Sequence, residues 1–131
     1  MTAQLLGGGP EIGIVVRDPV RTLAFYRDFL GLPIEKQSES RTAHVWWLRC
    51  GGGFVKLVHQ RVTPDAANPP GGMQAATGLR FLTLVVGNPE ELAANAEAAG
   101  GRVVREHADA ELWMGMLEDP EGNQVEVVRW Y

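Results

Sequence analysis

The feature that most constrains this chain is an internal repeat. When the sequence is compared with itself at an offset of 70 residues, apolar pairs, prolines and glycines coincide. The coinciding residues are Val15-Val16 with Val85-Val86, Pro19 with Pro89, and Gly31 with Gly101. Self-similarity at a fixed period is typical of a supersecondary unit that is used more than once. A chain of 131 residues has the size of one compact domain, so the two units are expected to share a core.

Each unit predicts the element order βαβββ. The first strand ends at Asp18-Pro19, where Asp18 can cap a helix and Pro19 can occupy its first position, and Gly31 ends that helix. In the second unit Asn88-Pro89 and Gly100-Gly101 do the same. The predicted strands are 11–17, 34–38, 43–50 and 54–60, then 81–87, 102–107, 112–118 and 124–130. The fold class is therefore α+β, with tandem βαβββ modules.

Composition along the chain predicts the boundaries of the modules. Residues 1–10 are a flexible leader, 11–60 the first module, 61–77 a linker and 78–131 the second module. The linker segment is rich in Pro and Gly and has no hydrophobic periodicity. All parts are expected to form one compact domain.

The overall composition excludes several classes of protein. With 45% apolar and 21% charged residues, the chain is not expected to be disordered. It has 12 basic and 16 acidic residues and no basic cluster, so nucleic acid is not an expected partner. Its single cysteine, Cys50, cannot form an internal disulfide, and neither a signal peptide nor a membrane span is apparent. These observations predict a cytoplasmic protein without a membrane partner.

Two sequence motifs are similar to those of a known family. They are Val16-Arg17-Asp18-Pro19 with the following Ala24 to Leu32 (AFYRDFLGL), and Glu118 to Asn123 (EDPEGN) followed by Val125-Glu126-Val127. The chain resembles the vicinal oxygen chelate superfamily, which includes glyoxalase I, bleomycin-resistance proteins, fosfomycin-resistance enzymes and extradiol dioxygenases. The resemblance implies curved sheets around a central cavity that holds a small molecule. It also implies a homodimer, since chains of this family often pair.

The alternation of apolar residues predicts which strand side chains face the cavity. Side chains of a strand point alternately to its two faces, and the apolar row packs under the helix. In the first strand Ile12, Ile14 and Val16 form that row, which leaves Glu11 on the cavity side. The same argument directs Phe54 and Lys56, Phe81, and Glu126 with Trp130 into the cavity.

The resemblance implies that metal-dependent relatives carry their ligands at positions 11, 56, 81 and 126. Glu11 and Glu126 could bind a metal, but Phe81 offers no donor atom. Lys56 would repel a divalent cation by about 8 kcal/mol at 4 Å and an effective dielectric constant of about 20. We therefore expect neither a metal nor another cofactor.

A lysine between two glutamates has two possible uses. In the catalytic use, Glu126 or Glu11 removes a proton next to a carbonyl and Lys56 stabilises the enolate oxygen, as in a lyase or isomerase. In the structural use, Glu11, Lys56 and Glu126 form a charge cluster that only shapes a binding cavity. The sequence leaves both uses open.

Aromatic side chains are the candidate ligand contacts. Trp46 and Trp47 are adjacent, so one of them must face the cavity in either strand register. His44 shares a face with Trp46 and is a candidate in one of these registers. The full set of candidates is Phe54, Phe81, Trp46, Trp47, Trp130 and His44. Such a wall suits planar or cationic organic molecules.

Several functions are consistent with these residues. The first is a metal-independent protein that binds an aromatic or carbonyl-bearing molecule, either to sequester it, as resistance proteins do, or to transform it by acid–base chemistry. The second is a metal-dependent lyase or isomerase that resembles glyoxalase I, with further ligands from a dimer partner. An extradiol dioxygenase is disfavoured, because the ligand positions lack two histidines. Whether the cavity lies within one chain or between two is open.

Overall fold

The computed structural model describes residues 1–131 and contains two βαβββ modules, so the predicted α+β class is confirmed. The first module consists of β1 (Glu11–Val15), α1 (Pro19–Leu23), the π-helix η1 (Ala24–Phe29), β2 (Ile34–Glu39), β3 (Ala43–Cys50) and β4 (Gly53–Gln60). The second consists of β5 (Phe81–Val85), α2 (Pro89–Asn95), β6 (Arg102–Ala108), β7 (Leu112–Glu118) and β8 (Gln124–Trp130). A short 3-10 helix, η2 (Gly72–Gln74), lies between the modules. No helix is long and apolar enough to span a lipid bilayer.

Both sheets have the same topology. The strand orders are β1-β4-β3-β2 and β5-β8-β7-β6. β1 runs parallel to β4 and β5 runs parallel to β8, whereas all other neighbours are antiparallel. The repeat in the sequence is therefore a repeat in structure, and the two sheets remain separate rather than closing into one barrel.

The helices begin where the sequence predicts. The Asp18 carboxylate accepts a hydrogen bond from the backbone N–H of Arg21 at 3.1 Å, which is the expected N-cap. Asn88 occupies the corresponding N-cap position, but its side chain donates to the Glu91 carboxylate at 2.9 Å instead of capping the backbone. Both helices have proline at their start.

The first helix widens after Leu23. The N–H of Leu30 donates to the carbonyl of Phe25, five residues earlier, at 2.9 Å, as in a π-helix. The adjacent residues Phe25 and Tyr26 are fully buried, while Leu23 and Leu30 are only half-buried at the edge of the core. Phe25 and Tyr26 lie three and four residues after the buried Thr22, so helical spacing places both of them on this face.

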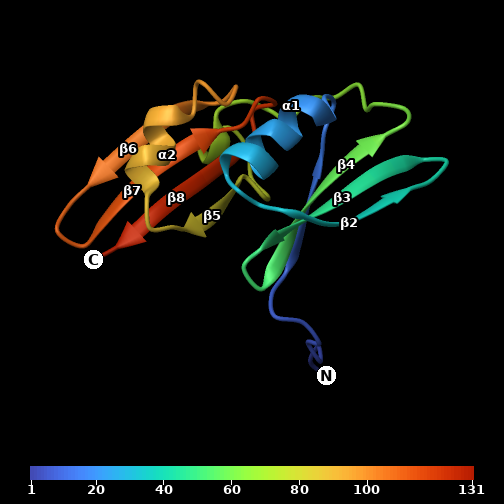
Figure 1. Ribbon diagram of the computed structural model, residues 1–131, viewed down its shortest axis with the longest axis horizontal. Helices are drawn as coiled ribbons and strands as arrows, with labels where there is room; N and C mark the ends of the chain where they lie inside the picture. Colours follow the sequence, from blue (N-terminus) through green and yellow to red (C-terminus); the bar gives the residue numbers. More distant parts are fainter.

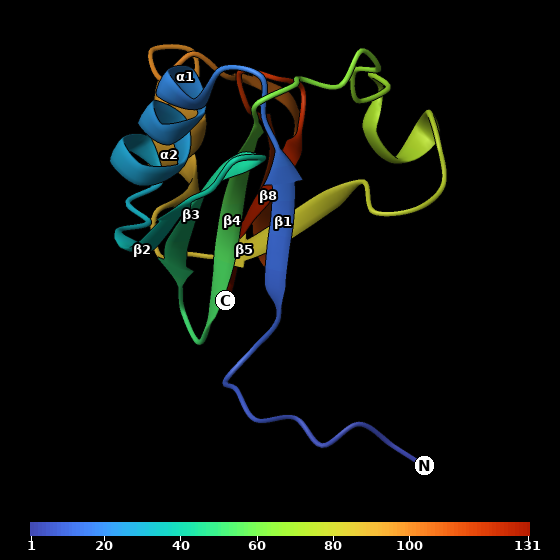
Figure 2. The ribbon, with the colours of Figure 1, turned by 90° about the vertical axis from the view of Figure 1, so that its right-hand side faces the viewer.

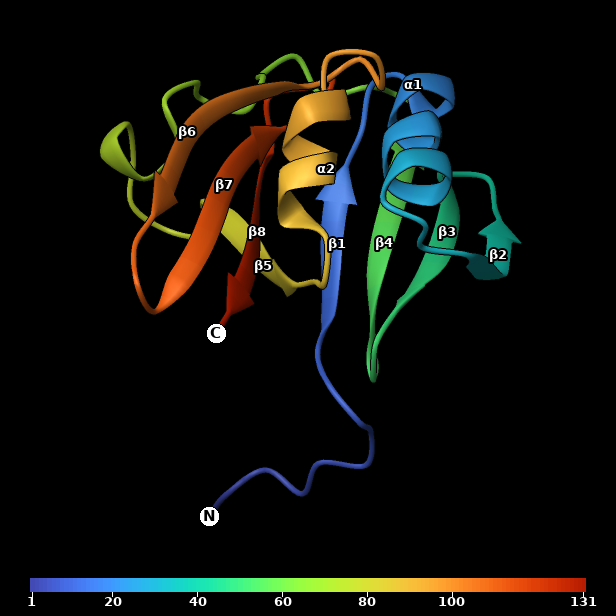
Figure 3. The ribbon, with the colours of Figure 1, turned by 60° about the vertical axis from the view of Figure 1, so that its left-hand side comes forward.

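One hydrophobic core joins the two modules. It contains Phe25 and Tyr26 of the first helix, Ala93 of the second, Leu57 of the first sheet and Val127 of the second. Figures 1 and 3 show α1 and α2 side by side between the two sheets, and Figure 2 shows both helices on one side of the strands. Each sheet thus packs one face against a helix and leaves the other free of helices; we call the latter its open face.

The two family motifs meet in space and hold the modules together. The Tyr26 hydroxyl donates to the buried Asp119 carboxylate at 2.8 Å, and Asp119 also accepts from the backbone N–H of Asn123 at 2.9 Å. The Glu121 carboxylate accepts from the backbone N–H groups of Arg17 and Asp18, both at 2.7 Å. Burial, together with the Asp119 charge, raises the pKa of Tyr26 well above its ordinary value.

Candidate functional site

Strand register divides the open face of the first sheet into three rows that cross the strands. The middle row is Gly13, Lys56, Trp47 and Lys36. Beside it lie a mostly apolar row, Val15, Val58, Val45 and Ser38, and a charged aromatic row, Glu11, Phe54 and Arg49. Directly opposed residues on neighbouring strands are in side-chain contact range. The face therefore combines aromatic, apolar and cationic groups.

Trp47 is the centre of the middle row. Its ring centre lies 4.7 Å from the Lys36 ammonium and 5.9 Å from that of Lys56. The two lysines come from the strands on either side of β3, so both contribute cation–π contacts to one indole. Lys56 Nζ also lies 3.2 Å from Glu11 Oε2, while its side chain is 29% exposed. This lysine is held in place on the face but remains accessible.

The charged aromatic row is internally paired. The Arg49 guanidinium lies 4.0 Å from the ring centre of Phe54 and also donates hydrogen bonds to the Glu35 carboxylate. These hydrogen bonds hold the pKa of the Glu35 carboxyl below its usual value. Arg49 and Glu35 thus neutralise each other at the edge of the face.

The open face of the second sheet has a different middle row. It consists of Thr83, Glu126, Met116 and Arg105. The Thr83 hydroxyl donates to Glu126 Oε1 at 2.9 Å. Met116 is buried, as is Val128 in the adjoining row, so this face has an apolar floor around one carboxylate.

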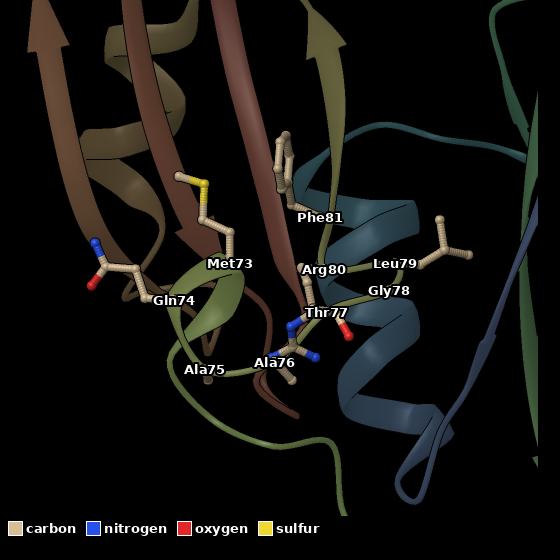
Figure 4. Close-up of a pocket in the computed structure, with 9 residues that line it drawn as sticks. All are labelled: Met73, Gln74, Ala75, Ala76, Thr77, Gly78, Leu79, Arg80 and Phe81. Atoms are coloured by element: carbon tan, nitrogen blue, oxygen red, sulfur yellow. The ribbon is translucent and has the colours of Figure 1, made fainter.

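The second open face is bordered by the segment before β5. Arg80 fixes this segment by donating to the carbonyls of Gly72 at 2.8 Å and Pro69 at 2.7 Å. The loop and the first residue of β5 line an open hollow of about 570 Å³ formed by residues 73–81. Figure 4 shows that the Met73 and Phe81 side chains extend from the loop in the same direction, whereas Leu79 points away from them.

A larger groove runs between the free edges of β1 and β5. Its volume is about 1290 Å³, and its lining includes Glu11, Gly13, Val15, Phe81 and Gln124. Of the residues predicted to face a cavity, Glu11 and Phe81 are therefore brought to one groove. Neither Lys56 nor Glu126 lines it.

The predicted trio of Glu11, Lys56 and Glu126 is only partly assembled within the chain. Lys56 forms an ion pair with Glu11, but no ion pair joins Lys56 to Glu126, which bonds to Thr83 instead. The reason is the position of the helices: they lie between the sheets, so the two open faces look in different directions. Within one chain, Lys56 does not lie between two glutamates.

The structure distinguishes the two adjacent tryptophans. Trp47 opposes Lys56 and shares the open face, whereas Trp46 opposes Leu57 and is buried on the helix side. His44 follows Trp46: its ring stacks on that indole at 3.8 Å between ring centres and bonds to Gln37 at 3.0 Å. His44 and Trp46 therefore belong to the helix-covered face and not to the open face.

The remaining aromatic candidates lie on the open faces. Phe54 is in the first sheet, and Phe81 and Trp130 are in the second, where Trp130 opposes Leu112 at the far end and is 59% exposed. Lys36 was not among the predicted residues. A register shift between Ile34 and Lys36 interrupts the alternation of β2, so its orientation could not be read from the sequence.

The four family positions do not fit a metal ion within the chain. The Lys56 ammonium is 3.2 Å from the Glu11 carboxylate, where it would repel a cation bound to that carboxylate. Phe81 provides no donor, and Glu126 lies on another face. No group of three or more His, Cys, Asp or Glu side chains in the chain lies close enough together to hold a metal.

The family follows from a sequence comparison. The model of the Glyoxalase/Bleomycin resistance protein/Dioxygenase superfamily matches residues 10–127. The chain therefore belongs to this superfamily, which confirms the predicted resemblance. Among curated protein sequences no significant match is found.

Solved structures share the fold over nearly the whole chain. A glyoxalase family protein from Bacillus cereus is 15% identical, with a TM-score of 0.81 and coverage of 99% of this chain and 98% of that one. The trypanothione-dependent glyoxalase I of Leishmania major is 18% identical, with a TM-score of 0.71 and coverage of 91% and 84%. The fosfomycin resistance protein FosX of Listeria monocytogenes is 13% identical, with a TM-score of 0.70 and coverage of 94% and 93%. At these identities the likeness concerns the fold alone.

Proposed function

We propose that this protein binds a small aromatic or carbonyl-bearing organic molecule on its open sheet faces, without a metal ion. The observation that carries the proposal is the accessible Lys56–Glu11 pair beside Trp47, on a face that no helix of the chain covers. An indole offers a planar apolar surface, and the ion pair offers both a donor and an acceptor to polar groups of a ligand.

We further propose that two copies of the chain close the binding cavity. A twofold axis that places the first sheet of one copy against the second sheet of the other creates two identical cavities. Each cavity would then have Lys56 and Glu11 on one wall and Glu126 on the opposite wall. Exposed apolar residues at these faces, such as Val15 and Val85, support such pairing.

A catalytic role is the second candidate, favoured by the state of Glu126. This carboxylate accepts from Thr83 and forms no ion pair within the chain. In an isomerase reaction Glu126 removes a proton from the carbon next to a carbonyl, the electron pair moves to the carbonyl oxygen, and the Lys56 ammonium stabilises the enolate. Return of the proton to the opposite face of the same carbon completes an epimerisation without a co-reactant.

Binding is tested by nuclear magnetic resonance (NMR) of the tryptophan indole N–H groups. A library of small aromatic and carbonyl compounds is added to 15N-labelled protein, and at least one compound is expected to shift the Trp47 signal. The Trp46 signal, on the helix-covered face, serves as the internal control. If no compound shifts Trp47, the proposed binding role is refuted.

Two variants distinguish a catalytic function from ligand sequestration. Lys56→Ala and Glu126→Gln are expected to abolish turnover of a bound carbonyl compound while ligand contact with Trp47 is kept. A protein that only sequesters its ligand would show no turnover in either variant or in the wild type.

Elemental analysis of protein purified without chelator tests whether the protein works without a metal ion. One divalent ion per chain would favour a glyoxalase I-like enzyme.

A further inference from the structure

Gly13 has no packing role in the strand that contains it. A Cβ atom built at this position would meet no atom within 4 Å, and Gly13 is not among the glycines with positive φ. Glycine inside a strand weakens it, and it often marks a place that another molecule approaches closely. The free space lies in the open face directly beside Lys56, which opposes Gly13 on β4.

The second module shows what a side chain does at this position. Thr83 is the equivalent residue under the 70-residue repeat, and its hydroxyl donates to Glu126 at 2.9 Å. There the carboxylate on the neighbouring strand receives one hydrogen bond from within the chain. On the first sheet, Gly13 leaves the flank of Lys56 uncovered.

The charges of the first open face favour an anion. Lys36, Lys56 and Arg49 contribute three cations, whereas Glu11 and Glu35 contribute two carboxylates. Arg49 pairs with Glu35 and Lys56 pairs with Glu11, so Lys36 is the cation in excess. In the proposed dimer, Glu126 of the opposite wall is offset by Arg105 in the same row. The chain as a whole has a net charge of -4, which makes this positive surplus a local property of the face.

From these observations we infer the chemical class of the ligand. The molecule bound on the first open face carries an anionic oxygen group, such as a carboxylate, which lies over Gly13 and contacts the Lys56 ammonium. Its apolar body lies along the row of Val15, Val58 and Val45, on the side away from Glu11. Lysine has three N–H donors, so Lys56 can bind this group and keep its contact with Glu11. The inference rests on the proposed binding function and specifies its ligand.

The test compares benzoate with benzamide, which has the same ring but no charge. Binding to each is measured from the shift of the Trp47 indole N–H signal. Benzoate is expected to bind and benzamide to bind at least about tenfold more weakly, because benzamide lacks the negative charge that strengthens the hydrogen bond from the Lys56 ammonium. Equal affinities, or no shift with benzoate, would overturn the inference.

The role of Gly13 is tested with a matched pair of variants. Gly13→Val fills the space over the strand and is expected to weaken benzoate binding by about tenfold or more, as an added group does in a fitted pocket. Gly87→Val is the control, because Gly87 also lacks a positive φ and has nothing within 4 Å of its Cβ position, but lies before α2. Circular dichroism checks that both variants fold, and unchanged benzoate affinity in Gly13→Val contradicts the inference.

A third variant separates charge from shape. Lys56→Met keeps the length of the side chain and removes the ammonium, and it is expected to abolish the preference for benzoate over benzamide. If Lys56→Met still prefers benzoate over benzamide, a group other than Lys56 binds the carboxylate. Failure of the ligand inference leaves the proposed function intact if uncharged library compounds still shift Trp47. If no compound shifts the Trp47 signal, both the ligand inference and the proposed function fail.

Discussion

At the scale of single residues, burial decides which polar contacts stabilise the protein. The Lys56–Glu11 pair is partly exposed, and such pairs contribute about 0–1 kcal/mol. The Tyr26–Asp119 hydrogen bond is buried, and a hydrogen bond to a charged group contributes about 1.5–3 kcal/mol. The former contact is therefore available for ligand binding, while the latter maintains the fold.

Glu11→Gln is expected to change the unfolding free energy by less than about 1 kcal/mol. The same variant removes the negative charge beside Lys56 and so should strengthen binding of an anionic ligand. Urea unfolding measures the stability, and a benzoate titration measures the affinity. A large loss of stability would mean that the pair has a structural role.

Tyr26→Phe is expected to lower the unfolding free energy by about 1–3 kcal/mol, because Asp119 loses one buried donor. Tyr131→Phe is the matched control, since the Tyr131 hydroxyl bonds only to Arg129 on the surface. Urea unfolding of the two variants should give a clear loss for the first and little change for the second. Equal stabilities would show that the hydrogen bond contributes nothing.

The raised pKa of Tyr26 predicts that the stability of the protein depends on pH in the alkaline range. Its pKa is raised in the folded protein above the ordinary value of 10.0, first by burial and then by Asp119. The unfolded chain therefore loses this proton at lower pH than the folded one, and the stability is lost as pH rises beyond the ordinary value. The difference in unfolding free energy between wild type and Tyr26→Phe should shrink as pH rises above that value. A constant difference would contradict the assigned shift.

At the scale of elements, the alternation of apolar residues predicted which side chains face the helices in those strands that have one polar or small-residue face. In β1, β4 and β8 the alternation was clear, and Ile14, Leu57 and Val127 pack on the helix side as expected. In β3 the run from Val45 to Leu48 is apolar on both faces, so the alternation could not distinguish Trp46 from Trp47. The π-turn of the first helix depends on packing of Phe25 and Tyr26 and has no signal in the spacing.

The close approach of the first helix to the second module predicts an effect at Gly101. A Cβ atom there would collide with the carbonyl oxygen of Glu118 and the ring of Phe25. Gly101→Ala is therefore expected to destabilise the protein by about 1–3 kcal/mol. Gly87→Ala, which meets nothing within 4 Å, should be neutral or slightly stabilising. Thermal unfolding of both variants checks this, and equal melting temperatures would refute it.

At the scale of the whole molecule, the position of the helices determines where a cavity can form. Lys56 and Glu126 lie on faces free of helices, but sequence alternation could not show how the two modules are oriented. That orientation depends on contacts far apart in sequence, such as Tyr26 with Asp119 and Arg17 with Glu121. As a result the two walls predicted for one cavity belong to different sides of the chain.

Pairing of two chains predicts a variant that separates them. Val85 is 71% exposed on the second open face, and Val85→Asp would place an unpaired charge in the proposed interface. Analytical ultracentrifugation is expected to show a dimer for the wild type and a monomer for this variant. Val20→Asp is the control, because Val20 is 77% exposed on α1 at the other side of the sheet. A monomeric wild type would contradict the pairing.

The divergence of the two middle rows has a consequence for selectivity. Gly13, Lys56, Trp47 and Lys36 occupy the same places in the first sheet as Thr83, Glu126, Met116 and Arg105 in the second. Two identical walls would accept a guest equally well in either of two orientations. Walls that differ in charge, in hydrogen bonding and in aromatic content distinguish the two ends of a ligand. The duplicated unit therefore has the asymmetry that binding in a single orientation requires.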